Sequence, residues 1–145
     1  MVKFYIATRI NRTEDHNSVR DALLVRGHQI TYDWTTHKDK PRFESTAALR
    51  VVGVAMIKGV EEADVTIVLL PGGGGTHVEL GVALALGKQV LIHSEEAIPF
   101  QLGPETKAFY HHPLVTQVIS SFKQLQPLLD AFIDRVDSTV VSLNT

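Results

Sequence analysis

The stretch DVTIVLLPGGGGTHVELG, residues 64–81, decides the fold of this chain. Its first seven residues are mostly apolar and rich in β-branched side chains, which predicts a buried strand over residues 64–70. Four consecutive glycines follow Pro71, and each of them costs backbone entropy on folding. We therefore expect the glycines to do what residues with a Cβ cannot, which is to turn tightly and let a ligand approach the backbone.

A helix over residues 76–87 is expected after the glycines, with Thr76 as its N-cap and Glu79 as its third residue. A capping box between Thr76 and Glu79 would explain both residues without any ligand. The alternative is a cradle for an anion or a hydroxyl group, which the helix start forms together with Gly73, Gly74 and Gly75. In that interpretation Glu79 lies at the mouth of a sugar site, and the helix end favours its ionised form by roughly 0.3–1 kcal/mol. An ionised carboxylate suits a nucleophile that attacks an anomeric carbon.

Short apolar runs alternate with amphipathic stretches along the rest of the chain. Helices are expected from Thr13 to the Gly27 stop, from about Phe43 to Ala63, and from Phe122 to Val136, with a loosely held tail from Asp137. Residues 36–45 and 95–113 are expected to be irregular. Besides residues 64–70, the predicted strands cover residues 2–8, 28–34, 88–94 and 114–120.

This alternation predicts a single α/β domain over residues 1–145. Its centre is a doubly wound, flavodoxin- or Rossmann-like sheet of five parallel strands with helices on both faces. Ligands of such sheets bind beyond the carboxyl ends of the strands. In this chain those ends are the loops after Thr8, Trp34, Leu70 and His93.

The composition limits the classes of function. A net charge of −2 without a long basic run argues against a nucleic-acid polymer as partner. No cysteine is present, so a disulfide framework and a thiol nucleophile are excluded. We expect no membrane span, no signal peptide and no cofactor, and a place in the cytoplasm by default.

Three segments resemble the nucleoside 2-deoxyribosyltransferase family and the related 2'-deoxynucleoside 5'-monophosphate N-hydrolases. They are KFYIATRINR (3–12), GHQITYDWT (27–35) and EEADVTIVLLPGGGGTHVELGVALALGKQVLI (61–92). The resemblance implies that Glu79 is the nucleophile that takes the deoxyribosyl group as a covalent intermediate. It places Tyr5, Thr8 and Arg9 at the family's first-strand and substrate-loop positions. It also implies a small nucleoside or nucleotide substrate, and a homo-oligomer whose subunits complete one another's sites.

PGGGGTHVE, residues 71–79, is also similar to the signature of the cytokinin-activating nucleotide phosphoribohydrolases. Those proteins are longer and carry a further glycine-rich motif where this chain has THKDKPRFES, so this family ranks second. Both resemblances imply cleavage of an N-glycosidic bond.

The chain departs from the deoxyribosyltransferase pattern in one respect. Relatives usually carry an acid about two helical turns before the Ala63–Asp64 pair, whereas this chain has Ala-Met-Ile-Lys over residues 55–58. Three explanations stay open. Another carboxylate substitutes, base departure is assisted differently, or the protein is a nucleotide-binding module that has lost the chemistry. The candidate carboxylates are Asp33, Asp39, Glu44 and Glu62.

Several other polar and aromatic residues are expected near the ends of the strands, where they could contact a ligand. Arg9, Asn11 and Arg12 follow the first strand and could hold a 5'-phosphate or belong to a solvated loop. Trp34 could stack on a base, and His93 could transfer a proton. Asp64 begins a strand at its amino end, which favours a structural role. Two adjacent histidines, His111 and His112, rarely chelate one ion together, so no metal is expected.

Overall fold

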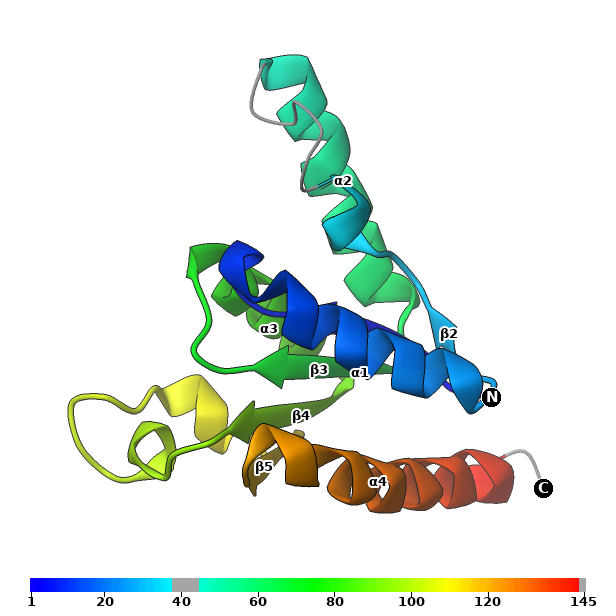
Figure 1. Cartoon of the computed structure of the whole chain (residues 1–145), viewed down its shortest axis with the longest axis vertical. Helices are drawn as coiled ribbons and strands as arrows, with labels where there is room; N and C mark the ends of the chain where they lie inside the picture. The colour runs from blue at the N-terminus through cyan, green and yellow to red at the C-terminus, as the bar shows by residue number, and fades with distance from the viewer. Residues whose placement is uncertain (38–44, 144–145) are drawn as a thin grey trace.

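The computed structural model describes the backbone of residues 1–37 and 45–143 and the side chains of residues 1–36 and 45–138. Five parallel strands form one sheet in the order β2-β1-β3-β4-β5 (Figure 1). They are β1 (Lys3–Ala7), β2 (Gln29–Ile30), β3 (Val65–Leu69), β4 (Gln89–Ser94) and β5 (Val115–Ile119). The helices that connect and follow them are α1 (Thr13–Val25), α2 (Thr46–Glu62), α3 (Gly74–Ala85) and α4 (Phe122–Leu143). The predicted doubly wound sheet is confirmed.

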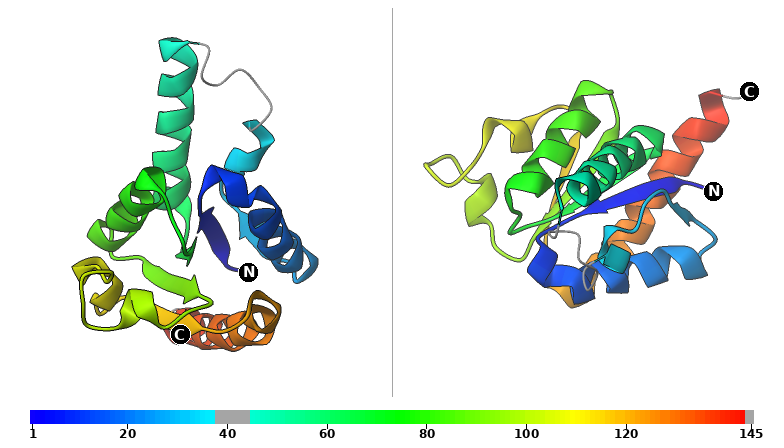
Figure 2. Two further views of the ribbon diagram at one scale, coloured as in Figure 1. Left: turned by 60° about the vertical axis from the view of Figure 1, so that its left-hand side comes forward. Right: turned by 90° about the horizontal axis from the view of Figure 1, so that it is seen from above.

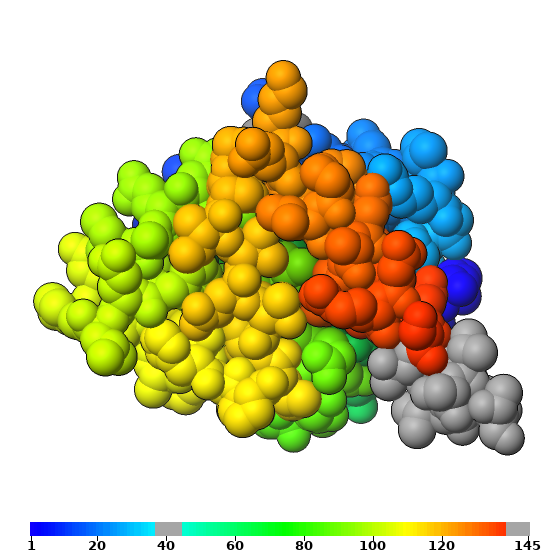
Figure 3. Space-filling model, turned by 90° about the horizontal axis from the view of Figure 1, so that it is seen from below, coloured from blue at the N-terminus to red at the C-terminus, as the bar shows by residue number. Residues whose placement is uncertain are grey.

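Side chains alternate between the two faces of the sheet, and each face has its own core. Phe4, Ile6 and Leu91 pack with apolar residues of α1 and α4. Tyr5 and Ile92 belong to the opposite core, together with residues of α2 and α3. The two views in Figure 2 show this division of the helices. Seen from below, α4 and the segment between β4 and β5 make up much of the surface (Figure 3).

The second strand is much shorter than the predicted 28–34, because the chain leaves the sheet after Ile30. The backbone N–H of Thr35 donates to the Asp33 carboxylate at 2.9 Å, and the Thr36 hydroxyl donates to the Asp33 carbonyl at 2.9 Å. Such local bonds favour a turn over an extended strand. Trp34 accordingly begins the 3-10 helix η2 (Trp34–His37), where the prediction of a strand end is wrong.

Two helices differ from their predicted bounds. Ser45 caps α2 by accepting the Ala48 N–H at 3.0 Å, so the helix begins at Thr46, and Phe43 lies outside the described residues. The last helix, α4, continues to Leu143, beyond the expected end at Val136. In Figure 1, α2 projects from the body of the molecule. Within the described residues, no helix is long and apolar enough to cross a membrane.

Asp64 lies at the amino edge of the sheet, as its position before β3 predicts. Its carboxylate accepts the Lys3 backbone N–H at 2.9 Å, and its own N–H donates to the Lys3 carbonyl at 2.8 Å. These bonds join β1 and β3 at the edge opposite the loops that follow the strands. The structure thus gives Asp64 a structural contact.

Close packing of α2 on the sheet depends on Gly59. A Cβ there would lie 2.8 Å from the Tyr32 Cβ and 2.9 Å from Tyr5 Cδ2, whereas a Cβ on Gly53 would meet nothing within 4 Å. We expect Gly59→Ala to lower the free energy of unfolding by about 1–3 kcal/mol through overpacking. Gly53→Ala, in the same helix, should raise it by about 0.5–1 kcal/mol. Urea unfolding measures both, and equal effects would contradict this account of the α2 packing.

Candidate functional site

The loops after β1 and β3 meet where the strand order reverses. The chain runs from β1 outward to β2 on one side and from β3 through β4 to β5 on the other, so the crevice above β1 and β3 is the usual place for a ligand. A cavity of about 160 Å3 lies there. Residues from the first-strand loop, η2, α2 and α3 line it: Thr8, Arg9, Ile10, Trp34, Met56, Gly73, Gly75, Thr76 and Glu79.

The glycine loop starts α3 earlier than the sequence predicts. Gly73 is the N-cap in an extended conformation, with φ −99° and ψ −169°, and Thr76 is the third helical residue. The Thr76 hydroxyl accepts the Gly73 N–H at 3.1 Å. The expectation of Thr76 as N-cap and Glu79 as its capping-box partner is therefore wrong, because the glycines cap the helix themselves. Glu79 is the sixth residue of α3.

Only one of the four glycines is explained by contacts within the protein. A Cβ on Gly72 would lie 2.7 Å from Thr76 Cγ2. A Cβ on Gly73 would touch only Arg9 Cγ, at 3.9 Å, and Cβ atoms on Gly74 or Gly75 would meet nothing within 4 Å. None of the four has a positive φ. The bare backbone from Gly73 to Gly75 therefore faces open space, as a cradle for a ligand requires.

Glu79 provides the acidic group of the cavity. Its side chain lines the cavity, although the residue is only 6% exposed. The favourable effect of a helix N-terminus fades within the first turn. Because Glu79 lies beyond that turn, the expected stabilisation of its ionised form by the helix end does not apply.

The first-strand loop is tied to the loop after β3 by three side-chain bonds. The Thr8 hydroxyl donates to the Leu69 carbonyl at 2.9 Å, and Arg9 Nε donates to the Gly72 carbonyl at 3.3 Å. Arg12 donates from Nη1 to the Leu70 carbonyl and from Nε to Asp15 at 2.9 Å. These bonds hold the cavity wall on which Thr8 and Arg9 lie.

Arg9 lines a second and larger cavity as well. This space of about 610 Å3 is bordered by Asn11 and Arg12 and by the loop that follows β4. Arg9 therefore lies between the Glu79 cavity and a wider groove. A cation at this junction can hold an anionic group of a ligand whose other end lies near Glu79.

Trp34, Met56 and Ile10 form the apolar part of the cavity wall. The Trp34 indole is 2% exposed and donates its Nε1–H to the Ile6 carbonyl at 2.8 Å. Met56 comes from α2. An aromatic side chain next to a carboxylate suits a ligand that has a flat ring beside a sugar.

Three of the predicted site residues do not line this cavity. Tyr5 is fully buried beneath Gly59, on the α2 and α3 side of the sheet, and Gly74 is exposed at the start of α3. His93 packs edge-on against Phe122 of α4, with Nε2 2.9 Å from the Ser120 carbonyl. Burial lowers the pKa of His93, which keeps the ring neutral. Strand alternation places His93 with Leu91 on the face opposite Glu79, so the structure does not bring it to the site.

Sequence reasoning missed the contact that holds the start of α3 from outside. His77 Nδ1 lies 2.8 Å from the Gly73 carbonyl, and Nε2 lies 2.7 Å from the Tyr110 hydroxyl. Tyr110 belongs to η4 (Ala108–His111), in the segment that was expected to be irregular. His77 and Tyr110 are 33 residues apart in the chain, and no short sequence pattern predicts a contact between residues so far apart.

Of the four candidate second carboxylates, the two that the structure describes are bound to other residues and do not line the cavity. Asp33 is bound to Arg20 and Thr35, and Glu62 lies 3.6 Å from Lys58 at the end of α2. Asp39 and Glu44 lie outside the described residues. Among the described residues that line the cavity, Glu79 is the only acid. Among all the residues that the structure describes, no group of three or more His, Asp or Glu side chains is placed to hold a metal ion.

Comparisons with known proteins agree with this geometry. The family described as nucleoside 2-deoxyribosyltransferase matches residues 4–128, and no curated protein matches the chain. Among solved structures, the CMP N-glycosidase BcmB of Clostridium botulinum is similar, with 18% identity, a TM-score of 0.60 and coverage of 89% of this chain and 98% of that one. A 2-deoxyribosyltransferase from Bacillus psychrosaccharolyticus shares 18% identity, with a TM-score of 0.66 and coverage of 86% and 90%. At 18% identity, the likeness to these two solved structures shows that this chain shares their fold.

Proposed function

The chain belongs to the nucleoside 2-deoxyribosyltransferase family, and from this premise we propose that it cleaves the N-glycosidic bond of a nucleoside or a nucleoside 5'-monophosphate. Glu79 acts as the nucleophile. The observation that carries the proposal is a carboxylate beside bare glycine backbone in a cavity at the switch point of the sheet.

The proposed reaction has two displacements at the anomeric carbon. A Glu79 oxygen attacks the anomeric carbon while the bond between that carbon and the base nitrogen breaks. The bonding electron pair leaves with the base, and the base takes up a proton. The product is a glycosyl ester of Glu79. In the second step a nitrogen of another base or a water oxygen attacks the same carbon, its bond to the Glu79 oxygen breaks, and the carboxylate is released while the attacking group gives up a proton to solvent.

Three features of the cavity support this substrate class. The open space over Gly73 and Gly75 leaves room for a sugar close to the backbone. The Trp34 indole offers a face or an edge for the base. Arg9, which lines both the cavity and the adjoining groove, offers a place for a 5'-phosphate.

We further propose that the protein is a homo-oligomer in which a second copy helps complete this site. The cavity of about 160 Å3 is smaller than the roughly 300 Å3 at which ligand pockets usually begin. In addition, α2 projects from the body and exposes several apolar side chains: Leu49, Val51, Val54 and Ile57. Because Met56 of the same helix lines the cavity, a copy packed on α2 would lie next to it.

The first test is a substrate panel. Each deoxynucleoside, ribonucleoside and 5'-monophosphate is incubated with and without a second free base, and released or exchanged base is measured by liquid chromatography. Exchange that needs the acceptor indicates a transferase, and release in water indicates a hydrolase. Glu79→Gln should lower the rate by at least about a thousandfold, the scale of losing a nucleophile.

Glu62→Gln is the matched control for the loss of an acid, because Glu62 lies at the far end of α2, and it should keep the parent rate. Arg9→Ala should affect monophosphates more than nucleosides. If every substrate stays intact although ligands bind, the protein is a nucleotide-binding module. If Glu79→Gln reacts as fast as the parent, Glu79 is not the nucleophile.

The second test fills the cradle without disturbing the fold. We expect Gly75→Ala to lower kcat/KM by between about tenfold and a hundredfold, because a methyl group would occupy space that the sugar needs. The matched control is Gly81→Ala, in the same helix, where a Cβ also meets nothing within 4 Å but the cavity is not involved. Both variants should unfold at no lower urea concentration than the parent. Parent-like kcat/KM in Gly75→Ala would contradict the cradle.

The third test concerns assembly. Multi-angle light scattering should give a multiple of the 16.0 kDa chain mass for the parent. Val54→Glu, on the exposed face of α2, should lower that mass and the activity together. Val25→Glu introduces the same charge at an exposed residue at the end of α1 and should change neither. A parent that stays at the mass of one chain at micromolar concentration would refute the oligomer.

A further inference from the structure

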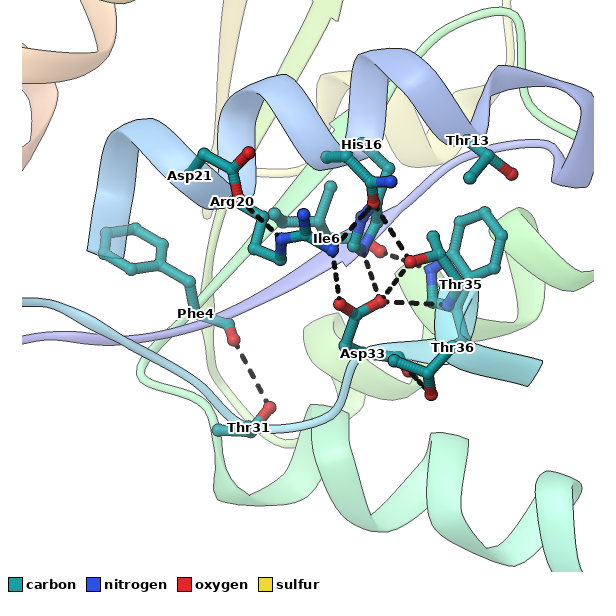
Figure 4. A network of polar contacts seen from close by, with 12 residues as sticks. Phe4, Ile6, Thr13, His16, Arg20, Asp21, Thr31, Asp33, Thr35 and Thr36 are labelled. Carbon is teal, nitrogen blue, oxygen red and sulfur yellow. Dashed lines mark hydrogen bonds and ion pairs between the residues drawn. The ribbon is translucent and has the colours of Figure 1, made fainter. Parts of the chain in front are cut away.

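A polar network surrounds the turn after β2, on the side of the chain that faces α1 (Figure 4). At its centre is the Asp33 carboxylate. Its Oδ2 accepts from Arg20 Nη1 at 2.8 Å, and its Oδ1 accepts from the Thr35 N–H at 2.9 Å and from the Thr35 hydroxyl at 2.5 Å. Asn17 Oδ1 lies 3.0 Å from both Arg20 Nη1 and the Thr35 hydroxyl. Two residues of α1 therefore hold the turn from outside.

Trp34 lies between the two residues that this network fixes. Its indole is buried, donates to the Ile6 carbonyl of β1 and packs edge-on against His16, with ring centroids 4.9 Å apart. The same indole lines the Glu79 cavity. The network and the cavity are thus connected through one residue of backbone, since Asp33 and Thr35 flank Trp34 in the chain.

The ionic state of the network favours a fixed turn at neutral pH. Burial alone would raise the pKa of Asp33, but hydrogen bonds from Thr35 and Arg20 hold it below its ordinary value. Burial lowers the pKa of His16, whose Nε2 lies 4.0 Å from Asp33 Oδ1. Asp33 is therefore an ionised carboxylate whose charge is balanced by Arg20.

We propose that Asp33 is a positioning residue that sets the place of the Trp34 indole in the wall of the Glu79 cavity, and through it the affinity for substrate. Asp33 does not line the cavity and donates no group to the reaction. For the nature of the substrate, the inference rests on the proposed function. The placement of Trp34 does not depend on it.

Fluorescence tests the placement directly, because Trp34 is the only tryptophan of the chain. Asp33→Asn keeps the shape of the side chain but removes its charge. We expect its emission maximum to move to longer wavelength and acrylamide quenching to increase, with the far-UV circular dichroism unchanged. Asp21→Asn is the matched control: it removes the other carboxylate bound to Arg20, at 2.8 Å, but does not touch the turn, and its emission should equal that of the parent.

Kinetics test the consequence for the site. Asp33→Asn should raise KM about tenfold, the scale of one lost charged hydrogen bond, while kcat stays within about twofold. Asp64→Asn serves as a stability control, because it removes a hydrogen bond at the opposite edge of the sheet and should leave KM unchanged. A merely structural role for Asp33 would lower stability and leave both KM and the emission of the folded protein unchanged.

A second pair of variants covers the case in which Asp33→Asn does not fold. Thr35→Val removes the hydroxyl that bonds to Asp33 and should shift the emission in the same direction, whereas Thr35→Ser keeps the hydroxyl and should resemble the parent. Parent-like emission in Thr35→Val, or in Asp33→Asn where that variant folds, would overturn the proposal. If the emission shifts but the parent cleaves neither nucleosides nor their 5'-monophosphates, the positioning role stands and the proposed function fails.

Discussion

The parallel pairing of β1 with β3 is the constraint on which the site depends. It places Phe4 to Ala7 beside Val65 to Val68 and so brings the two following loops together. Thr8, Arg9 and Arg12 then reach carbonyl groups of Leu69, Gly72 and Leu70. Because the sheet is wound outward in both directions from this pair, the space above it is covered by neither crossover. The cavity with Glu79 is the direct result.

The glycine run acts through this arrangement in two ways. Gly72 allows the chain to pack against Thr76, where a Cβ would lie 2.7 Å from Thr76 Cγ2. The next three glycines begin the helix early, at Gly74, and the backbone of Gly73 and Gly75 lines the cavity. The early start moves Glu79 into the second helical turn, away from the exposed N–H groups of the first.

The sequence predicts well what depends on local pattern. Near-continuous apolar runs predicted the strands. The glycine run and Glu79 predicted where the cavity lies. The same alternation also separates His93 from the site, once Val90 and Ile92 are assigned to one face and Leu91 to the other. The departure of Trp34 from the second strand could have been expected from Asp33 and Thr35, because Asp commonly bonds to the backbone two residues later. The contacts of Arg20 with Asp33 and of His77 with Tyr110 join distant segments, so no short pattern shows them.

The contacts of Asp33 bear on which group gives a proton to the leaving base. As a carboxylate at the expected end of a strand, it was a candidate for the acid that relatives carry before the Ala63–Asp64 pair. Its two oxygens are occupied by Arg20 and Thr35, and a carboxylate held ionised in this way is a poor proton donor. The described wall of the cavity then contains one acid, one cation and a set of neutral groups. Under the proposed function Glu79 accepts the sugar, and the proton for the leaving base then comes from water or from a group outside the described wall of this cavity.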